Sequence, residues 1–194
     1  MKNLRPGADN KGQDAGFTLV ELVAVLVIAG ILAAFALPRF FTKSNYDVSA
    51  YFNQAQGILR YGQKLAIAQG TNVYVRLNGA SVALCYNAAC TSTVSPPSGS
   101  NSGGAATLTA CGGSTTWECE APAADVTYSS ANASSVSYNA ANAMFYFSPQ
   151  GKPYNTGDLE PISNFNSKLT INLAASSGTT LSFYVEQETG YVHH

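Results

Sequence analysis

The sequence predicts an α+β protein in which one long N-terminal helix packs on a small antiparallel β-sheet. Residues 17–37 form an apolar run whose only ionisable residue is Glu21. Residues 39–70 then carry apolar side chains at three- and four-residue spacing, which indicates an amphipathic helix. From residue 71 onwards, short β-branched and aromatic runs alternate with turn residues, as in antiparallel sheets. Together these patterns favour a helix followed by a β-rich head at residues 71–194.

The apolar run is long enough to cross a membrane. At about 1.5 Å per residue, it covers the roughly 30 Å hydrocarbon core of a bilayer, so residues 17–38 are expected to form a transmembrane helix. A carboxylate inside such a run costs about 2.5–3.5 kcal/mol, which indicates that Glu21 has a partner. Cleavage after Gly16 would supply one, because it creates an α-amine one helical turn away.

Basic residues outnumber acidic residues before the apolar run, and this places the N-terminus in the cytoplasm. The rest of the chain is then expected on the far side of the membrane, anchored by a single pass. Residues 1–16 are interpreted as a leader and are excluded from the fold.

The six residues Gly16-Phe17-Thr18-Leu19-Val20-Glu21 resemble the class III signal of type IV pilins and type II secretion pseudopilins. The resemblance implies that prepilin peptidase cleaves between Gly16 and Phe17 and N-methylates Phe17. It also implies that Glu21 acts in methylation and subunit docking, and that Pro38 kinks the helix. The resemblance further implies a pilin fold and a location in the bacterial inner membrane, with the head in the periplasm, before the subunit enters the pilus or pseudopilus.

Two ordinary interpretations of the same segment remain. One is a secretory signal peptide cleaved near Ala34-Phe35-Ala36, and the other is a plain single-span anchor with an incidental glutamate. Neither explains why glycine, phenylalanine and glutamate occur at these positions. The pilin-like interpretation is therefore preferred.

The helix is expected to continue past Pro38, which bends it without ending it. Gly70 is placed to end it in a left-handed conformation. Asn78-Gly79 predicts a hairpin between strands at residues 72–77 and 81–86. Further strands are expected at residues 126–128, 143–147, 169–173 and 181–185, the last two joined as a hairpin by residues 176–179.

Residues 87–124 are rich in Ser, Thr and Gly and show no core-forming pattern, which predicts a long loop. In the periplasm, the four cysteines are expected as disulfides. Four cysteines allow three connectivities, and the sequence does not choose among them. The local pairs Cys85–Cys90 and Cys111–Cys119 are favoured because each would close and stabilise an otherwise flexible loop. The cysteine spacing is not that of a metal site. The candidates are Cys85, Cys90, Cys111 and Cys119.

Three later segments narrow the resemblance. Residues 61–68 and 145–153 are similar to the helix end and the strand-turn motif of H-type pseudopilins and FimT-type minor pilins. Residues 185–193 resemble the terminal strand-turn-strand of the same group. Their ending is most similar to the minor pilin of the mannose-sensitive haemagglutinin (MSHA) pilus.

No catalytic arrangement is evident. The only histidines are His193 and His194, and no Ser/His/Asp set or phosphate-binding loop occurs. Asp158 and Glu160 lie close together in sequence, but a solvated loop explains them better than a cation site. We expect no enzymatic activity, no cofactor and no metal.

The charge is balanced, with ten Lys+Arg against eleven Asp+Glu, and no Lys or Arg follows Lys168. Some FimT-type pilins bind DNA through basic residues near the C-terminus, and this chain lacks them, which argues against DNA as a partner.

The function that this resemblance implies is a minor pilin of an MSHA-type or other type IV pilus, assembled with other pilins by helix packing in the filament or its tip complex. The alternative within the class is an H-type minor pseudopilin of a type II secretion system. An adhesion domain that uses its anchor only as a tether, and a secreted enzyme, are less consistent with the motif.

Overall fold

The computed structural model describes residues 18–132 and 144–194, and it leaves out the side chains of residues 35–42, 131 and 132. The chain divides into two units, Met1–Phe40 and Phe41–His194, each described by itself below. Gly16 and Phe17 lie outside the described residues.

Helix α1 spans Leu19–Gln69 and therefore continues past Pro38, as predicted. It ends at Gly70, whose φ of 63° is left-handed. The backbone N–H of Thr71 donates to the carbonyl of Ala66 at 3.3 Å, which closes the last turn in a Schellman-type arrangement. The bend expected at Pro38 lies close to the boundary between the two units, and the side chain of Pro38 is outside the described residues.

The β-strands form two antiparallel sheets, where the sequence predicted one. Sheet A has the order β3-β2-β1-β5-β6 and sheet B the order β4-β7-β8-β9. The strands of sheet A are β1 (Val73–Leu77), β2 (Val82–Cys85), β3 (Cys119–Glu120), β5 (Met144–Phe147) and β6 (Pro153–Asn155). Those of sheet B are β4 (Val126–Asn132), β7 (Leu169–Ala175), β8 (Thr180–Val185) and β9 (Val192–His193).

Both predicted hairpins are present. Strand β1 pairs with β2, and β7 pairs with β8, in antiparallel register. In the first turn, the side-chain oxygen of Asn78 accepts the backbone N–H groups of Ala80 and Ser81, and Gly79 has a φ of 77°. This is the local turn chemistry that an Asn-Gly pair provides.

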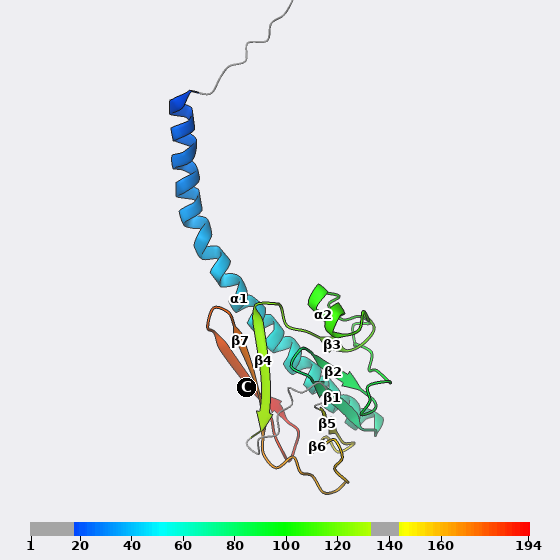
Figure 1. The fold of residues 1–194 in the computed structure, drawn as a ribbon. Helices are drawn as coiled ribbons and strands as arrows, with labels where there is room; N and C mark the ends of the chain where they lie inside the picture. The colour runs from blue at the N-terminus through cyan, green and yellow to red at the C-terminus, as the bar shows by residue number, and fades with distance from the viewer. Residues whose placement is uncertain (1–17, 133–143) are drawn as a thin grey trace, which may run out of the picture. The chain divides into compact units, whose positions relative to one another are not determined.

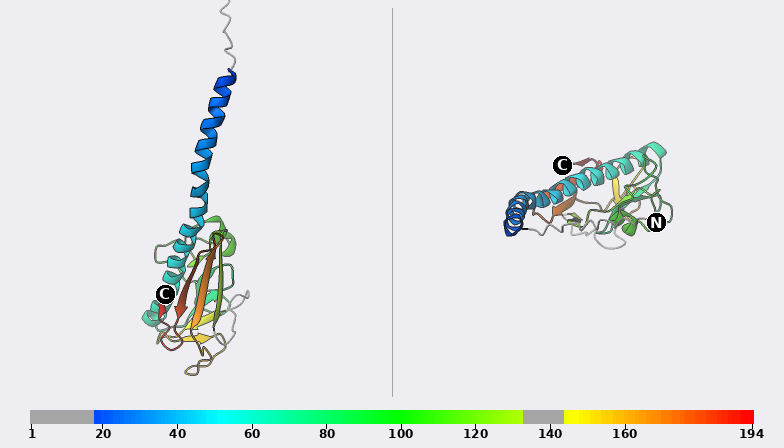
Figure 2. Two further views of the ribbon diagram at one scale, coloured as in Figure 1. Left: turned by 90° about the vertical axis from the view of Figure 1, so that its left-hand side faces the viewer. Right: turned by 90° about the horizontal axis from the view of Figure 1, so that it is seen from above.

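The second half of α1 lies along both sheets (Figure 1; Figure 2), and one face of it builds the main core. Helix residues at three- and four-residue spacing are buried there, as expected for an amphipathic helix. They pack against alternate residues of both sheets, whose burial follows the two-residue period of a strand. The helix residues in this core are Val48, Tyr51, Ala55, Ile58, Leu59 and Ala66.

Polar contacts fix the two sheets and the helix together within this unit. The hydroxyl of Tyr128 in β4 donates to the carbonyl of Ser81 at 2.5 Å and accepts the N–H of Gly79 at 2.9 Å, which joins sheet B to the β1–β2 turn. The amide nitrogen of Gln63 in α1 donates to the carbonyls of Gly151 and Thr189, at 3.1 and 2.7 Å. Two turns that are distant in sequence therefore rest on one helix side chain.

The segment 87–124 is more ordered than the predicted loop. It contains helix α2 (Ala105–Ala110) and strand β3, and it buries Trp117, whose indole N–H donates to the carbonyl of Leu84 at 2.7 Å. The segment builds a second hydrophobic cluster on sheet A, which we call the outer cluster. Its members are Ala83, Cys85, Cys111, Trp117, Cys119 and Met144.

Candidate processing and assembly segment

The predicted assembly segment begins at a capped helix end. The side-chain oxygen of Thr18 accepts the backbone N–H of Glu21 at 3.2 Å, and the Thr18 carbonyl accepts the N–H of Leu22 at 3.1 Å. Thr18 therefore has the position and the bond of an N-cap residue. Threonine at the N-cap with glutamate three residues later has the spacing of a capping box.

The role of Thr18 was missed in the sequence analysis, although the T-x-x-E spacing was there to find it. Glu21 lies in the first turn of α1, where a negative charge interacts favourably with the partial positive charge of the helix N-terminus. Its carboxylate makes no hydrogen bond or ion pair with any residue that the structure describes. The cap thus fixes the backbone at Glu21 without engaging its carboxylate.

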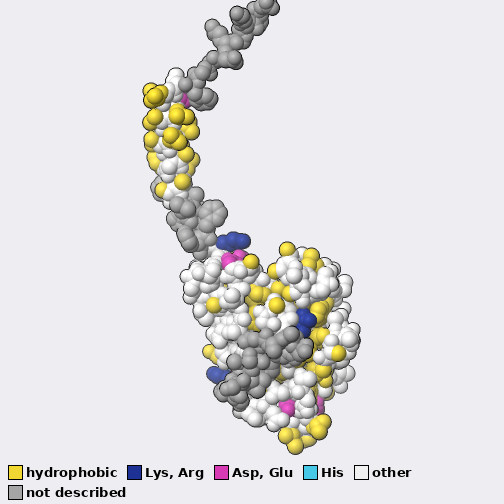
Figure 3. Space-filling view, in the orientation of Figure 1, with side chains coloured by type: hydrophobic (Ala, Val, Ile, Leu, Met, Phe, Trp, Pro, Cys, Tyr) yellow, Lys and Arg dark blue, Asp and Glu magenta, His cyan; other side chains and the backbone are white. Residues whose placement is uncertain are grey.

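Residues 19–34 of α1 are exposed on all sides, although nearly all are apolar. Leu19 is 79% exposed, Val20 is 75% exposed and Val25 is 55% exposed, and at 3.6 residues per turn these three side chains point in widely separated directions around the helix. Figure 3 shows hydrophobic side chains over this part of the chain. A helix that is apolar on every side is stable only when other apolar groups cover it.

Within the described residues, no helical stretch combines the length and the hydropathy needed for a membrane span.

The cysteines form two local disulfides, Cys85–Cys90 and Cys111–Cys119, with Cα–Cα distances of 5.1 and 6.0 Å. This is the pairing that the sequence analysis favoured. The second bridge lies in the outer cluster. There the guanidinium of Arg76 lies 4.5 Å from the centre of the Trp117 ring and donates to the carbonyl of Ala110 at 3.3 Å.

Two glutamates of the same segment lie in different environments. The carboxylate of Glu120 accepts the backbone N–H and the hydroxyl of Ser102, at 2.6 and 2.7 Å, and the hydroxyl of Thr107 at 2.8 Å. Glu118 is only 8% exposed, and its carboxylate has no hydrogen-bond partner in the described chain. Burial, with the charge of Glu120 as the second cause, raises the pKa of Glu118 to about 7.

Of the pair Asp158 and Glu160, Asp158 is engaged within its own loop. The Asp158 carboxylate accepts the backbone N–H of Asn155 at 2.8 Å and the backbone N–H and amide of Asn164, at 2.9 and 2.8 Å. These bonds organise the loop itself. No cluster of three or more potential metal ligands is found in the described parts of the chain.

Comparisons with known proteins bear on the N-terminal segment and on the chain as a whole. Residues 11–37 match the family described as Prokaryotic N-terminal methylation motif. The chain is 31% identical over 114 residues to the type IV narrow pilus major component PilA5 of Thermus thermophilus, covering 59% of this chain and 85% of that protein.

Among solved structures, the type IV minor pilin FimU of Pseudomonas aeruginosa PAO1 is similar, with a TM-score of 0.43 and 13% sequence identity, over 79% of this chain and 90% of that one. The extent and identity of the match to the Thermus pilin are those of a homologue. The chain belongs to the type IV pilin family.

Proposed function

We propose that this protein is a minor pilin, a non-enzymatic structural subunit of an MSHA-type or other type IV pilus. Members of the family are pilus-associated structural subunits that are anchored through their N-termini. In this proposal, prepilin peptidase removes residues 1–16 and N-methylates Phe17. Residues 17–38 hold the precursor in the inner membrane, with the head in the periplasm.

The observation that carries the proposal is the exposed apolar surface of residues 19–34, interrupted only by Glu21. A surface of this kind is unstable in water, and the lipid bilayer covers it in the stored subunit. In the filament, neighbouring pilin helices replace the lipid. Helix packing is then driven by burial of this surface, and the head takes no direct part in it.

Glu21 gives this packing its register. A carboxylate surrounded by apolar side chains is costly unless a positive charge neutralises it. The new amino terminus at Phe17 of a neighbouring subunit supplies that charge. Thr18 supports the contact because its cap holds the backbone of Glu21 in place, while the carboxylate has no partner among the residues that the structure describes.

The test is filament assembly with Glu21→Ala in the native host. We expect the variant to accumulate in the membrane with a folded, disulfide-bonded head and to enter filaments at a small fraction of the wild-type level. Glu188→Ala is the matched control, because that carboxylate is 69% exposed on the head. Normal incorporation of the Glu21→Ala protein would contradict the assembly mechanism.

Intact mass and N-terminal peptide analysis of the protein from native envelopes test the processing route. The proposal requires a chain that starts at methylated Phe17. A chain that starts at Leu37 would mean ordinary signal-peptide cleavage. Loss of protein secretion with intact pili, on deletion of the gene, would assign the subunit to a type II secretion system.

A further inference from the structure

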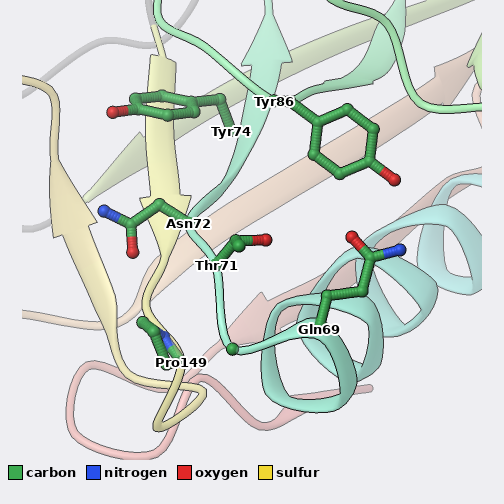
Figure 4. Close-up of a pocket in the computed structure, with 7 residues that line it drawn as sticks. Gln69, Thr71, Asn72, Tyr74, Tyr86 and Pro149 are labelled. Atoms are coloured by element: carbon green, nitrogen blue, oxygen red, sulfur yellow. The ribbon is translucent and has the colours of Figure 1, made fainter.

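We propose that a hollow on the surface of the head binds an uncharged glycan, at a site separate from the assembly segment. The hollow has a volume of about 620 Å³ and lies where α1 ends, β1 begins and the chain leaves β2. Figure 4 shows the side chains of Gln69 and Tyr86 extending towards each other, with the hydroxyl of Thr71 pointing into the space between them.

The C-terminal end of α1 forms one rigid side of the hollow. Gln69 is the last residue of α1, and Gly70 follows it in the left-handed conformation. The bond from the Thr71 N–H to the Ala66 carbonyl locks this turn. Gln69 and Thr71 therefore project from a backbone whose geometry is set before any ligand arrives.

Tyr74 is positioned by the sheet. Val73 and Val75 face the core, so Asn72 and Tyr74 face outwards, following the two-residue period of the strand. The ring of Tyr74 packs against Tyr146, its direct partner in β5, with ring centres 5.2 Å apart.

Tyr86 is positioned by a disulfide. It lies inside the short ring that the Cys85–Cys90 bridge closes, and its backbone N–H donates to the carbonyl of Ser92 at 2.8 Å. The bond from the Cys90 N–H to the Asn87 carbonyl, at 3.0 Å, tightens the same loop. Both tyrosines are thus held on rigid supports, which lowers the entropic cost of binding a ligand.

The polar groups at the hollow are free to bind. The hydroxyls of Tyr74, Tyr86 and Thr71 make no hydrogen bond to any part of the chain that the structure describes. The same holds for the side-chain amides of Gln69 and Asn72. Five neutral polar groups and two aromatic rings therefore belong to the residues that line the hollow. Tyr86, Gln69 and Thr71 extend to one side of β1, and Tyr74 and Asn72 to the other (Figure 4).

This chemistry selects the class of ligand. No Lys, Arg, Asp or Glu lines the hollow among the described residues, so it offers no counter-charge to a phosphate, a nucleic acid or a cation. Amides and hydroxyls both donate and accept hydrogen bonds, as sugar hydroxyls do. Aromatic rings cover the apolar C–H face of a sugar while their polar tips stay in water. A neutral sugar ring matches both features.

The test uses the purified full-length protein in a detergent without a sugar headgroup. Saturation-transfer NMR would be recorded with lactose, cellobiose, maltose, mannobiose and diacetylchitobiose, and with sialyllactose as the acidic comparator. Titration would then give a dissociation constant for each disaccharide that binds. We expect at least one neutral probe to bind and sialyllactose to gain nothing from its charge.

Three variants locate the binding. Tyr86→Ala should weaken it about tenfold, because one aromatic contact is lost. Tyr86→Phe keeps the ring and should retain most of the affinity. Tyr46→Ala removes a tyrosine that is 74% exposed on α1 and should leave binding unchanged. An unchanged near-ultraviolet circular dichroism spectrum, apart from the lost tyrosine, shows that each variant is folded.

The proposal is overturned if none of the neutral probes binds, or if Tyr86→Ala binds as well as the wild type. It is also overturned if the same variant alters self-association while no sugar binds, since the hollow would then be a contact for a second copy of the chain. None of these results depends on filament assembly, so failure of this proposal leaves the pilin proposal untouched.

Discussion

Gly190 packs directly on the carbonyl oxygen of Gly151, so closely that a Cβ built on Gly190 would overlap that oxygen. Gly190 also has a φ of 65°, and it lies beside the amide nitrogen of Gln63 that joins both turns to α1. The β5–β6 turn, the β8–β9 turn and the helix therefore meet at a point where a glycine is required for two reasons.

Gly190→Ala should destabilise the head more than its backbone conformation alone explains. An alanine at this φ costs about 1–2 kcal/mol, and the overlap with backbone adds about 1–3 kcal/mol. Thermal unfolding of the purified protein measures the effect. Gly112→Ala is the matched control, because Gly112 has the same φ of 65° and nothing within 4 Å of its Cβ position. Equal losses for the two variants would contradict the packing argument.

The stability of the head should fall as the pH rises from about 4.5 to about 7. The folded-state pKa of Glu118 is about 7, above the ordinary glutamate value of 4.5, so the folded protein binds this proton more tightly than the unfolded chain does. The stabilisation is complete below the unfolded-state pKa and is lost as the pH passes through the folded-state pKa. Denaturant unfolding across this range measures it.

Glu118→Gln should remove this pH dependence and should stabilise the protein above pH 7 by an amount on the order of 3 kcal/mol. At pH 4, the variant and the wild type should be similar. Glu160→Gln, at an exposed site, is the control and should follow the wild type. Parallel pH profiles for wild type and Glu118→Gln would show that Glu118 does not carry the effect.

Removing the Cys111–Cys119 bridge should loosen the outer cluster and spare the main core. The double variant Cys111→Ser/Cys119→Ser should lose about 2–4 kcal/mol of unfolding free energy. Limited proteolysis should then cut within residues 87–124 faster than in the wild type, while α1 between residues 48 and 66 stays protected. Simultaneous cleavage of both regions would mean that the two clusters unfold as one.

Thr18→Val should weaken the start of α1, because valine keeps the shape of threonine and removes the oxygen that accepts the Glu21 N–H. Loss of an N-cap costs about 1 kcal/mol. Amide hydrogen exchange of residues 19–22 in detergent micelles should accelerate several-fold. Thr18→Ser keeps the hydroxyl and should exchange at the wild-type rate. Similar exchange in Val and Ser variants would exclude a capping role.

Local chemistry made part of this fold predictable. Asn78 and Gly79 specify their turn through their own hydrogen bonds and conformation, and Gly70 ends α1 in the same way. The separation into two sheets had no such local cause, because β1 pairs with β5 and β4 with β7 across long stretches of chain. Strand composition alone does not encode these distant partners.

The segment 87–124 misled the sequence analysis because its abundant small residues hide a few that pack. The side chains of Trp117 and Cys119 anchor the segment on sheet A. A single tryptophan among serines and glycines forms no periodic pattern that a sequence analysis could detect. At the assembly segment, the cap by Thr18 could have been predicted from its spacing to Glu21. The hollow beside Tyr86 could not, since it exists only after a helix end, a strand and a disulfide loop have come together.

The two hydrophobic clusters use opposite faces of sheet A. In β2, Leu84 packs towards α1 in the main core, while Ala83 and Cys85 face the outer cluster. Val94 also belongs to the main core, but residues 97–116 contribute buried apolar side chains only to the outer cluster. Exposed positions among residues 97–116 can therefore vary without disturbing the register of the helix beneath the sheet. Evolution can diversify what the subunit displays while the part that must fit its neighbours stays the same, and the same segment is where a foreign peptide would be grafted first.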